Sequence, residues 1–179
     1  KARKTSIVTH IKPDGDALGS STGLYHILKM AGCQDVSILL PSRYPDNLAF
    51  ILKDIPSENI VIYDVDPERS LDTIAESDLI YCLDFNAFHR TEHFEKVLDE
   101  SRAIKVLIDH HLNPDSSKFD EKVSDIEVSS TSELLFYILM SSSAINDDAS
   151  RLPASCATAL YSGMTTDTNN FANSVFPST

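Results

Sequence analysis

The sequence predicts an α/β protein in which a doubly wound, mainly parallel sheet is flanked by helices. Three observations support this fold class. Short apolar runs alternate with stretches of helical periodicity, several helices carry recognisable start or stop residues, and 42% hydrophobic residues in a chain of 179 can bury a core. Alternating strands and helices are typical of right-handed βαβ units, which build an open parallel sheet.

Periodicity and helix boundaries define the elements of the first half. Apolar residues recur at i, i+3, i+4 and i+7 in a predicted helix at 17–30, which a glycine ends. A short helical piece at 48–52 precedes a helix at 67–76, where Asp66 can cap and Pro67 suits the first position. The expected strands of the whole chain are 6–9, 36–40, 59–63, 79–83 and 103–108.

The second half continues the alternation and ends in helices. A helix at 91–100 leads to the last expected strand, and a polar surface turn at 145–153 precedes a helix at 154–164. No linker interrupts the chain, so we treat 1–179 as one domain. A capping-box pattern, Ser130-Thr131-Ser132-Glu133, opens a predicted helix that runs through Met140. We interpret Glu133 as part of this cap and not as a metal ligand.

The charge balance limits the classes of partner. A formal net charge of −12 argues against a protein that grips long nucleic acid, because such binding needs clustered lysine and arginine. Bound cations would reverse the sign locally at an acidic site. Small phosphorylated substrates, or the end of an oligonucleotide, therefore remain compatible with the composition.

Cysteine usage predicts a protein of a reducing compartment, and hydropathy predicts no membrane-spanning segment. The three cysteines are an odd number and form no C-x-x-C pair, so neither a disulfide framework nor a zinc ribbon is indicated. We expect a cytoplasmic protein. No run of about 18 apolar residues is available to span a bilayer. No signal peptide precedes the first strand, although a start at Lys1 leaves a trimmed leader open.

One loop after the first strand gathers metal-binding residue types. His10, Asp14 and Asp16 fall within seven positions, and we expect Pro13 and Gly15 to let the backbone curl and aim these side chains at one point. Oxygen and nitrogen donors without a thiolate favour magnesium, manganese or similar cations over structural zinc. Taken alone, the pattern is also compatible with an ordinary polar turn that leads into a helix.

Further polar residues follow two other apolar runs. Asp84 comes after one of them, and the cluster Asp109-His110-His111 comes after another. Ligand sites of open parallel sheets lie outside the carboxyl ends of the strands, so these residues are expected to meet the first loop along one edge. Asp167, near the end of the last predicted helix, is a fourth acidic candidate.

Taken in order, these motifs resemble the four motifs of the DHH phosphoesterase family. The motifs are His10-x-x-Pro13-Asp14-Gly15-Asp16-Ala17-x-Gly19-Ser20, Asp84, Asp109-His110-His111 and Thr166-Asp167. Two contexts look most like the bacterial branch of oligoribonucleases and adenosine 3′,5′-bisphosphate phosphatases, which is also described as exopolyphosphatase-related. These contexts are Cys82-Leu83-Asp84-Phe85-Asn86 and Ser130-Thr131-Ser132-Glu133-Leu134.

The resemblance implies the N-terminal catalytic domain of that family with a site for two manganese ions, for which magnesium or cobalt are alternatives. The family's C-terminal substrate domain is absent from these residues. The implied ligands are His10 and Asp14 for one ion, Asp16, His110 and Asp167 for the other, and Asp84 as the bridge between the two.

The resemblance also implies roles beside the ions. Asp109 would orient an imidazole and His111 would face the substrate phosphate; together with Asp84 they are the expected catalytic residues. Arg90 is a candidate contact for a substrate phosphate. Other interpretations stay open: a strand-end cap for Asp109, an ordinary loop histidine for His111, and a solvated arginine at a helix start for Arg90.

The expected function is that of a manganese-dependent phosphohydrolase that uses two metal ions to activate water. Its expected substrates are very short oligoribonucleotides, linear dinucleotides and adenosine 3′,5′-bisphosphate, and self-association into a homodimer is left open. A cyclic-dinucleotide phosphodiesterase and a family II inorganic pyrophosphatase are alternatives. A non-catalytic nucleotide- or metal-binding module is an alternative from another class.

Overall fold

The computed structural model describes residues 4–173 and 175; residues 1–3, 174 and 176–179 lie outside the described residues. A six-stranded sheet with the order β3-β2-β1-β4-β5-β6 forms its centre, and every neighbouring pair is parallel. The predicted fold class is therefore confirmed. The strands are β1 (Lys4–Val8), β2 (Asp35–Leu40), β3 (Ile60–Ile62), β4 (Leu79–Leu83), β5 (Ile104–Asp109) and β6 (Glu121–Ser124).

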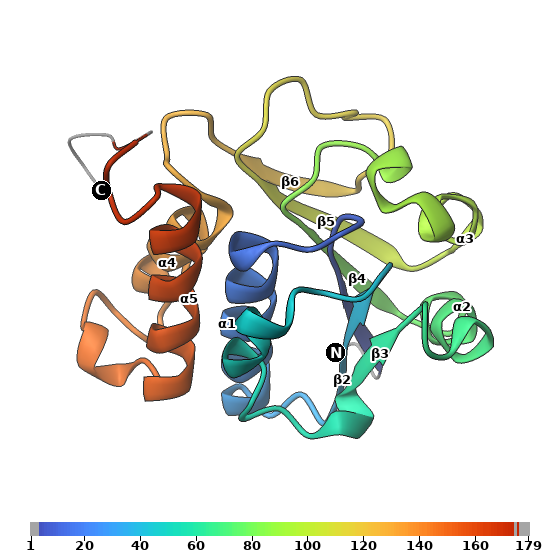
Figure 1. Cartoon of the computed structure of the whole chain (residues 1–179), viewed down its shortest axis with the longest axis horizontal. Helices are drawn as coiled ribbons and strands as arrows, with labels where there is room; N and C mark the ends of the chain where they lie inside the picture. The colour runs from blue at the N-terminus through green and yellow to red at the C-terminus, as the bar shows by residue number, and fades with distance from the viewer. Residues whose placement is uncertain (1–3, 174, 176–179) are drawn as a thin grey trace.

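Helices cover both faces of the sheet (Figure 1). One layer holds α1, α4 and α5, and the other holds α2 and α3. The α-helices are α1 (Gly15–Met30), α2 (Pro67–Ala75), α3 (Glu95–Glu100), α4 (Thr131–Ser141) and α5 (Ala154–Asp167). The 3₁₀ helices are η1 (Asp46–Ile51), η2 (Ser57–Asn59), η3 (Phe88–Phe94) and η4 (Ala149–Arg151).

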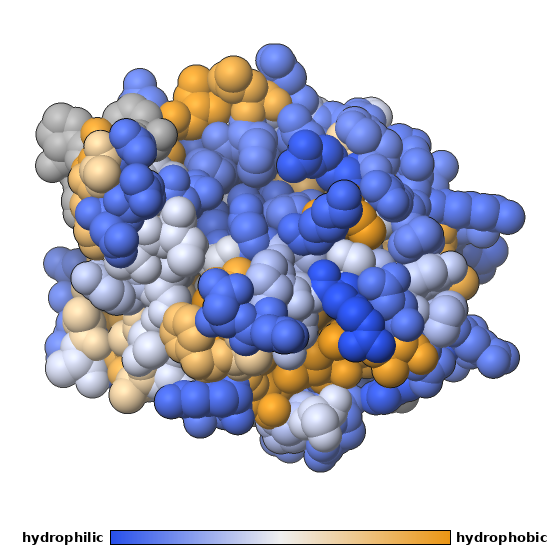
Figure 2. Space-filling view, viewed as in Figure 1, coloured by the Kyte–Doolittle hydropathy of each residue, from blue (hydrophilic) through white to orange (hydrophobic). Residues whose placement is uncertain are grey.

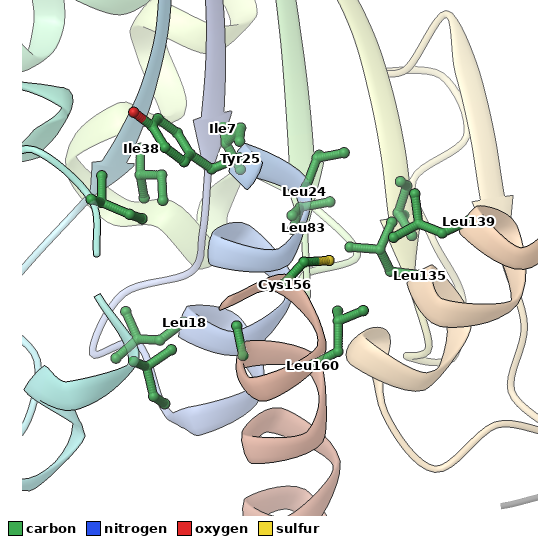
Figure 3. Packing of buried hydrophobic residues seen from close by; sticks show 14 of the residues in the cluster. Ile7, Leu18, Leu24, Tyr25, Ile38, Leu83, Leu135, Leu139, Cys156 and Leu160 are labelled. Atoms are coloured by element: carbon green, nitrogen blue, oxygen red, sulfur yellow. The ribbon is translucent and has the colours of Figure 1, made fainter. Parts of the chain in front are cut away.

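Each face of the sheet has its own hydrophobic core, because successive side chains of a strand point to opposite faces. Ile7 packs with residues of α1, α4 and α5, as Figure 3 shows for Leu24, Leu135 and Leu160. Its neighbour Val8 packs in the second core, which α2 and α3 cover. The sheet is thus buried on both sides, as expected for a doubly wound fold.

Several predicted boundaries change in the structure. Asp14 caps α1, which therefore begins at Gly15 instead of residue 17. The helix predicted at 91–100 is a 3₁₀ helix followed by the short α3, because Glu92 has a φ of 47° and interrupts it. Helix α5 continues three residues beyond the predicted end, as far as Asp167.

Strand β6 was not predicted from the sequence. All four of its residues are exposed, and its sequence EKVS contains a single apolar residue. It pairs only with β5, from Val106–Glu121 to Asp109–Ser124, and forms the edge of the sheet. Edge strands with charged side chains carry little hydrophobic pattern, so backbone pairing defines this one.

Glycines allow α1 to lie unusually close to α5. A Cβ at Gly19 would fall 2.6 Å from the carbonyl oxygen of Ala159 and 2.9 Å from the backbone of Gly163. A Cβ at Gly163 would fall 2.0 Å from the Oγ of Ser132, at the start of α4. The three helices therefore lie close together near the residues of α1 and α5 that are predicted as metal ligands. Among the described residues, no helix is both long and apolar enough to cross a bilayer.

We expect Gly19→Ala to lower the free energy of unfolding by about 1–3 kcal/mol, because the new methyl group meets backbone atoms that cannot turn away. Gly23→Ala is the matched control on the same helix, since its Cβ would meet only side-chain atoms of Leu160, which can turn aside more easily than backbone atoms can. It should stay within about 1 kcal/mol of the original protein. Urea unfolding measures both; equal losses would contradict this account of the α1–α5 contact.

Candidate metal centre

The residues predicted as ligands come together at the carboxyl edge of the sheet. Figure 2 shows that the molecule is hollowed over the N-terminus of α1 and that hydrophilic residues border the hollow. The candidate ligands reach this edge from the loop after β1, the first turn of α1, the ends of β4 and β5, and the end of α5. They are His10, Asp14, Asp16, Asp84, His110 and Asp167.

Asp84 occupies the middle of this arrangement. It follows β4 directly and is 2% exposed. Its Oδ2 lies 3.4 Å from the Nε2 of His10, and its Oδ1 lies 3.6 Å from the Nε2 of His110. Its φ of 64° is in the left-handed region, which aspartate and asparagine adopt more readily than most residues. One carboxylate therefore faces two imidazoles from different loops.

Potential ligand atoms within 4.8 Å of one another form three groups. Two of these groups share no residue. They contain the same residues as the two ligand sets that the resemblance implies, except that Asp84, expected to bridge both ions, occurs in only one of them. The third combines Asp84 with His110 and His111. The groups are His10, Asp14 and Asp84; Asp16, His110 and Asp167; and Asp84, His110 and His111.

The first group is oriented by the backbone. The Nδ1 of His10 lies 2.8 Å from the carbonyl oxygen of Ile11. Because a carbonyl only accepts, Nδ1 carries a proton, and the ring would offer Nε2 to a cation in its neutral form. That nitrogen lies 3.8 Å from the Oδ1 of Asp14. Asp14 also accepts hydrogen bonds from the amides of Asp16 and Ala17 and so caps α1.

The predicted role of Gly15 was wrong in its physical reason. The backbone turns at Lys12, which has a φ of 53°, while Gly15 is already helical. A Cβ at Gly15 would fall 2.2 Å from the Oγ1 of Thr166. The glycine between the two acids therefore lets the end of α5, which carries Asp167, approach the start of α1.

The second group is built around one deeply buried carboxylate. Asp16 is 1% exposed, and each of its carboxylate oxygens accepts a backbone hydrogen bond from the start of α4. The donors are the amides of Thr131, at 2.6 Å, and Ser132, at 2.8 Å. The Nε2 of His110 lies 3.5 Å from the Oδ2 of Asp167.

Like charges perturb the titration of these groups. Burial raises the pKa of Asp16 well above its usual range, and the charges of Asp84 and Asp167 add to this rise. Burial also raises the pKa of Asp167; Asp84 adds to the rise, although His110 opposes it. A divalent cation would neutralise this crowding, so the donor set fits a hard metal ion.

His10 responds in the opposite way from a merely buried histidine. Burial alone would lower its pKa, but the carboxylates of Asp14 and Asp84 outweigh this effect and raise the pKa to about 10. Without a metal ion, the ring therefore holds a proton near neutral pH. A bound cation would take the place of that proton.

Asp109 and His111 form a pair beside the candidate ligands. The Nδ1 of His111 lies 2.7 Å from the Oδ1 of Asp109, which is fully buried. This hydrogen bond raises the pKa of His111 in spite of partial burial. The side chain of Asp109 bonds to the imidazole and makes no hydrogen bond to a strand-end amide within the described residues.

Arg90 lies in η3 on the same side of the molecule. Its carbonyl accepts a hydrogen bond from the amide of Ile11 at 2.8 Å, so the two loops are joined next to His10. Its positive charge opposes the rise in the pKa of His111. The guanidinium makes no ion pair with any residue that the structure describes.

The contacts that α4 makes in this site were not predicted from the sequence. The capping box is present, since Ser130 accepts from the amide of Glu133 at 3.0 Å, but Glu133 accepts from Ser129 instead of Ser130. Within the same run, the Oγ1 of Thr131 donates to the Oδ1 of Asp84 at 3.0 Å. The local pattern explains the cap and contains no signal for this long-range contact.

An apolar cavity of about 460 Å³ lies elsewhere, between α4, η4 and α5. Leu152, Leu160 and Tyr161 are among its lining residues, and none of the predicted metal ligands is. The candidate centre is therefore the acidic edge of the sheet and not this cavity.

The N-terminal domain of the DHH family matches residues 4–164. The chain belongs to the DHH family. The resemblance to this family that the sequence motifs indicate is thereby confirmed.

Named relatives of this DHH protein include two enzymes. It is 27% identical over 168 residues to the cyclic-di-AMP phosphodiesterase PdeA of Listeria monocytogenes, covering 92% of this chain and 25% of PdeA. It is 27% identical over 172 residues to the bifunctional oligoribonuclease and PAP phosphatase NrnA of Mycoplasma pneumoniae, covering 94% of this chain and 47% of NrnA.

A solved structure is also similar. An exopolyphosphatase-related protein from Bacteroides fragilis superimposes with a TM-score of 0.84 and 39% identity, covering 97% of this chain and 48% of that protein. The chain thus spans about half or less of the length of these three relatives.

We expect manganese to raise the melting temperature of the protein relative to EDTA. Each site filled at 100 times its dissociation constant adds about 2.7 kcal/mol, or about 5–10 °C in a domain of this size. Asp84→Asn should abolish the rise, because the amide is a poor cation ligand but tolerates the left-handed φ of this position. Differential scanning fluorimetry measures both.

The control for this measurement is melting in EDTA, where Asp84→Asn should still unfold cooperatively at a defined temperature, which shows that the variant is folded before manganese is added. A manganese-induced rise of equal size in the variant would contradict the central position of Asp84.

Proposed function

We propose that this DHH domain is the catalytic part of a phosphohydrolase that uses two divalent cations, with manganese as the first choice. The observation that supports the proposal best is the placement of Asp84. Its two oxygens face imidazoles of separate ligand groups, at 3.4 and 3.6 Å. A carboxylate with one oxygen toward each group has the geometry of a bridging ligand.

The donors divide between the two cations as follows. His10 and Asp14 would hold one ion and Asp16, His110 and Asp167 the other, with Asp84 shared. When bound, such a pair of cations supplies an activated water and neutralises charge on the attacking and leaving oxygens of phosphorus. No covalent nucleophile is needed, and the buried Cys82 and Cys156 are packing residues.

His111 is the residue that would manage a proton at the substrate. Asp109 holds its Nδ1, so the Nε2 is turned away from that bond on a side chain that is 38% exposed. The pair keeps the imidazole in one orientation and favours its protonated form. His111 can therefore donate to a phosphate oxygen or to the leaving group.

Arg90 would bind the phosphate of the substrate. It is exposed and positively charged, and its backbone is tied to the loop that carries His10. A guanidinium at this place can pair with two phosphate oxygens at once. Because the chain has a net charge of −12, a local positive charge would offset the repulsion of a negatively charged substrate.

The proposed substrates are very short oligoribonucleotides, linear dinucleotides and adenosine 3′,5′-bisphosphate, in the cytoplasm. The similarity to NrnA over 94% of this chain supports this substrate class. A second candidate is a cyclic dinucleotide, which the similarity to PdeA over 92% of this chain favours.

A substrate panel on the intact protein with manganese tests this proposal. The panel holds di- to pentaribonucleotides, adenosine 3′,5′-bisphosphate, cyclic di-AMP and pyrophosphate, with products separated by chromatography. We expect release of mononucleotides or of 3′ phosphate. Turnover of cyclic di-AMP or pyrophosphate alone would replace the proposed substrate, and turnover of none would indicate a binding module.

The histidine pair gives a separate prediction. His111→Asn keeps a hydrogen-bond donor toward Asp109 but removes the Nε2. We therefore expect turnover to be slower by a factor of about 100 or more, with unchanged manganese binding. Isothermal titration and steady-state kinetics measure the two effects. If manganese binding fell as it should in Asp84→Asn, His111 would be a ligand and its proposed role would be wrong.

A further inference from the structure

One residue that is not a candidate ligand contacts two of the candidate ligands. The amide of Thr131 donates to the Oδ2 of Asp16 at 2.6 Å, and its hydroxyl donates to the Oδ1 of Asp84 at 3.0 Å. The three residues come from α4, α1 and the end of β4, and none is more than 2% exposed. Thr131 therefore joins two carboxylates that are far apart in the sequence.

The start of α4 has amides to offer because the first N–H groups of a helix lack partners within the helix. Ser130 accepts from Glu133, and this leaves the amides of Thr131 and Ser132 for another acceptor. Both donate to the carboxylate of Asp16. The positive end of the helix dipole favours the same negative charge.

These bonds leave room for a cation. Each carboxylate oxygen has two lone pairs, so an oxygen that accepts one hydrogen bond can still bind a metal ion. The hydrogen bonds fix the direction of the remaining lone pair. A buried carboxylate held in this way has lost its rotational freedom before the ion arrives.

The contact with Asp84 is not symmetric. The hydroxyl of Thr131 bonds to Oδ1, the oxygen that lies 3.6 Å from His110, while Oδ2 faces His10. Its amide holds Asp16, which belongs to the same group as His110. Both contacts of Thr131 thus fall on one half of the centre.

We propose that Thr131 is a positioning residue that sets the affinity of the metal ion held by Asp16, His110 and Asp167, and leaves the other ion almost unaffected. This inference rests on the proposed two-cation function. It goes beyond that function because it assigns different affinities to the two ions and attributes the difference to a residue that hydrogen-bonds to the candidate ligands. Outer hydrogen-bond partners of metal ligands typically contribute 10–100-fold to metal affinity.

A purely structural role for Thr131 makes a different prediction. The residue is buried at the start of α4, so the loss of its hydroxyl could lower stability. Such a loss would appear in the metal-free protein and would not distinguish between the two ions. Separate affinities for the two ions therefore distinguish positioning from support of the fold.

The chain offers matched variants. Thr131→Val keeps the shape and the amide but removes the hydroxyl, and Thr131→Ser keeps the hydroxyl. Thr22→Val is the control, because Thr22 is a buried threonine of α1 whose hydroxyl has no hydrogen-bond partner among the described residues. Thr131→Ala replaces the valine variant if the latter does not fold.

The experiment titrates the intact, metal-free protein with manganese, using calorimetry for the affinities and electron paramagnetic resonance for coupling between adjacent ions. We expect two ions in the original protein. In Thr131→Val, one ion should bind 10–100-fold more weakly and the coupled signal should require correspondingly more manganese. Thr131→Ser and Thr22→Val should behave like the original protein, and melting in EDTA should confirm folding of each variant.

Three results would overturn the inference, and a fourth would overturn its basis. If the original protein binds two ions and Thr131→Val binds both as tightly, or loses both equally, Thr131 does not position one ion. Failure of Thr131→Ser to restore binding would have the same meaning. If the original protein binds fewer than two manganese ions, the proposed function fails first, and the inference fails with it.

Discussion

The burial of like charges at one edge of the sheet is the constraint on which this structure depends. Asp16, Asp84 and Asp109 are all at most 2% exposed, in a chain that is already strongly acidic. Unpaired buried charges are costly, so each carboxylate needs its own compensation. Asp16 has the amides of α4, Asp109 has the imidazole of His111, and Asp84 has a hydroxyl and two imidazoles around it.

The close packing of α1 on α5 follows from the same constraint. The acids can share one centre only if the helices that carry them approach at the backbone, and Gly15, Gly19 and Gly163 make this approach possible. The acidic residues and the glycines therefore depend on each other: the glycines allow the close helix contact that places the carboxylates together. Their motifs are interleaved in the sequence for that reason.

Most of the fold and the identity of the polar residues could be predicted from the sequence. Buried strands such as β4 have a clear apolar run, and Asp84 at its end follows the rule for open parallel sheets. Strand β6 could not be predicted, because its exposed residues carry no hydrophobic pattern. The contact of Thr131 with Asp84 depends on how α4 packs, and no local signal encodes it.

The separation of the ligands along the chain also bears on synthesis. His10, Asp14 and Asp84 belong to the first half of the chain, whereas the other candidate group combines Asp16 from α1 with Asp167 from α5. A growing polypeptide on the ribosome can thus present the first donors early. The second candidate group can come together only after α5 has emerged and packed against α1, because Asp167 lies at the end of α5.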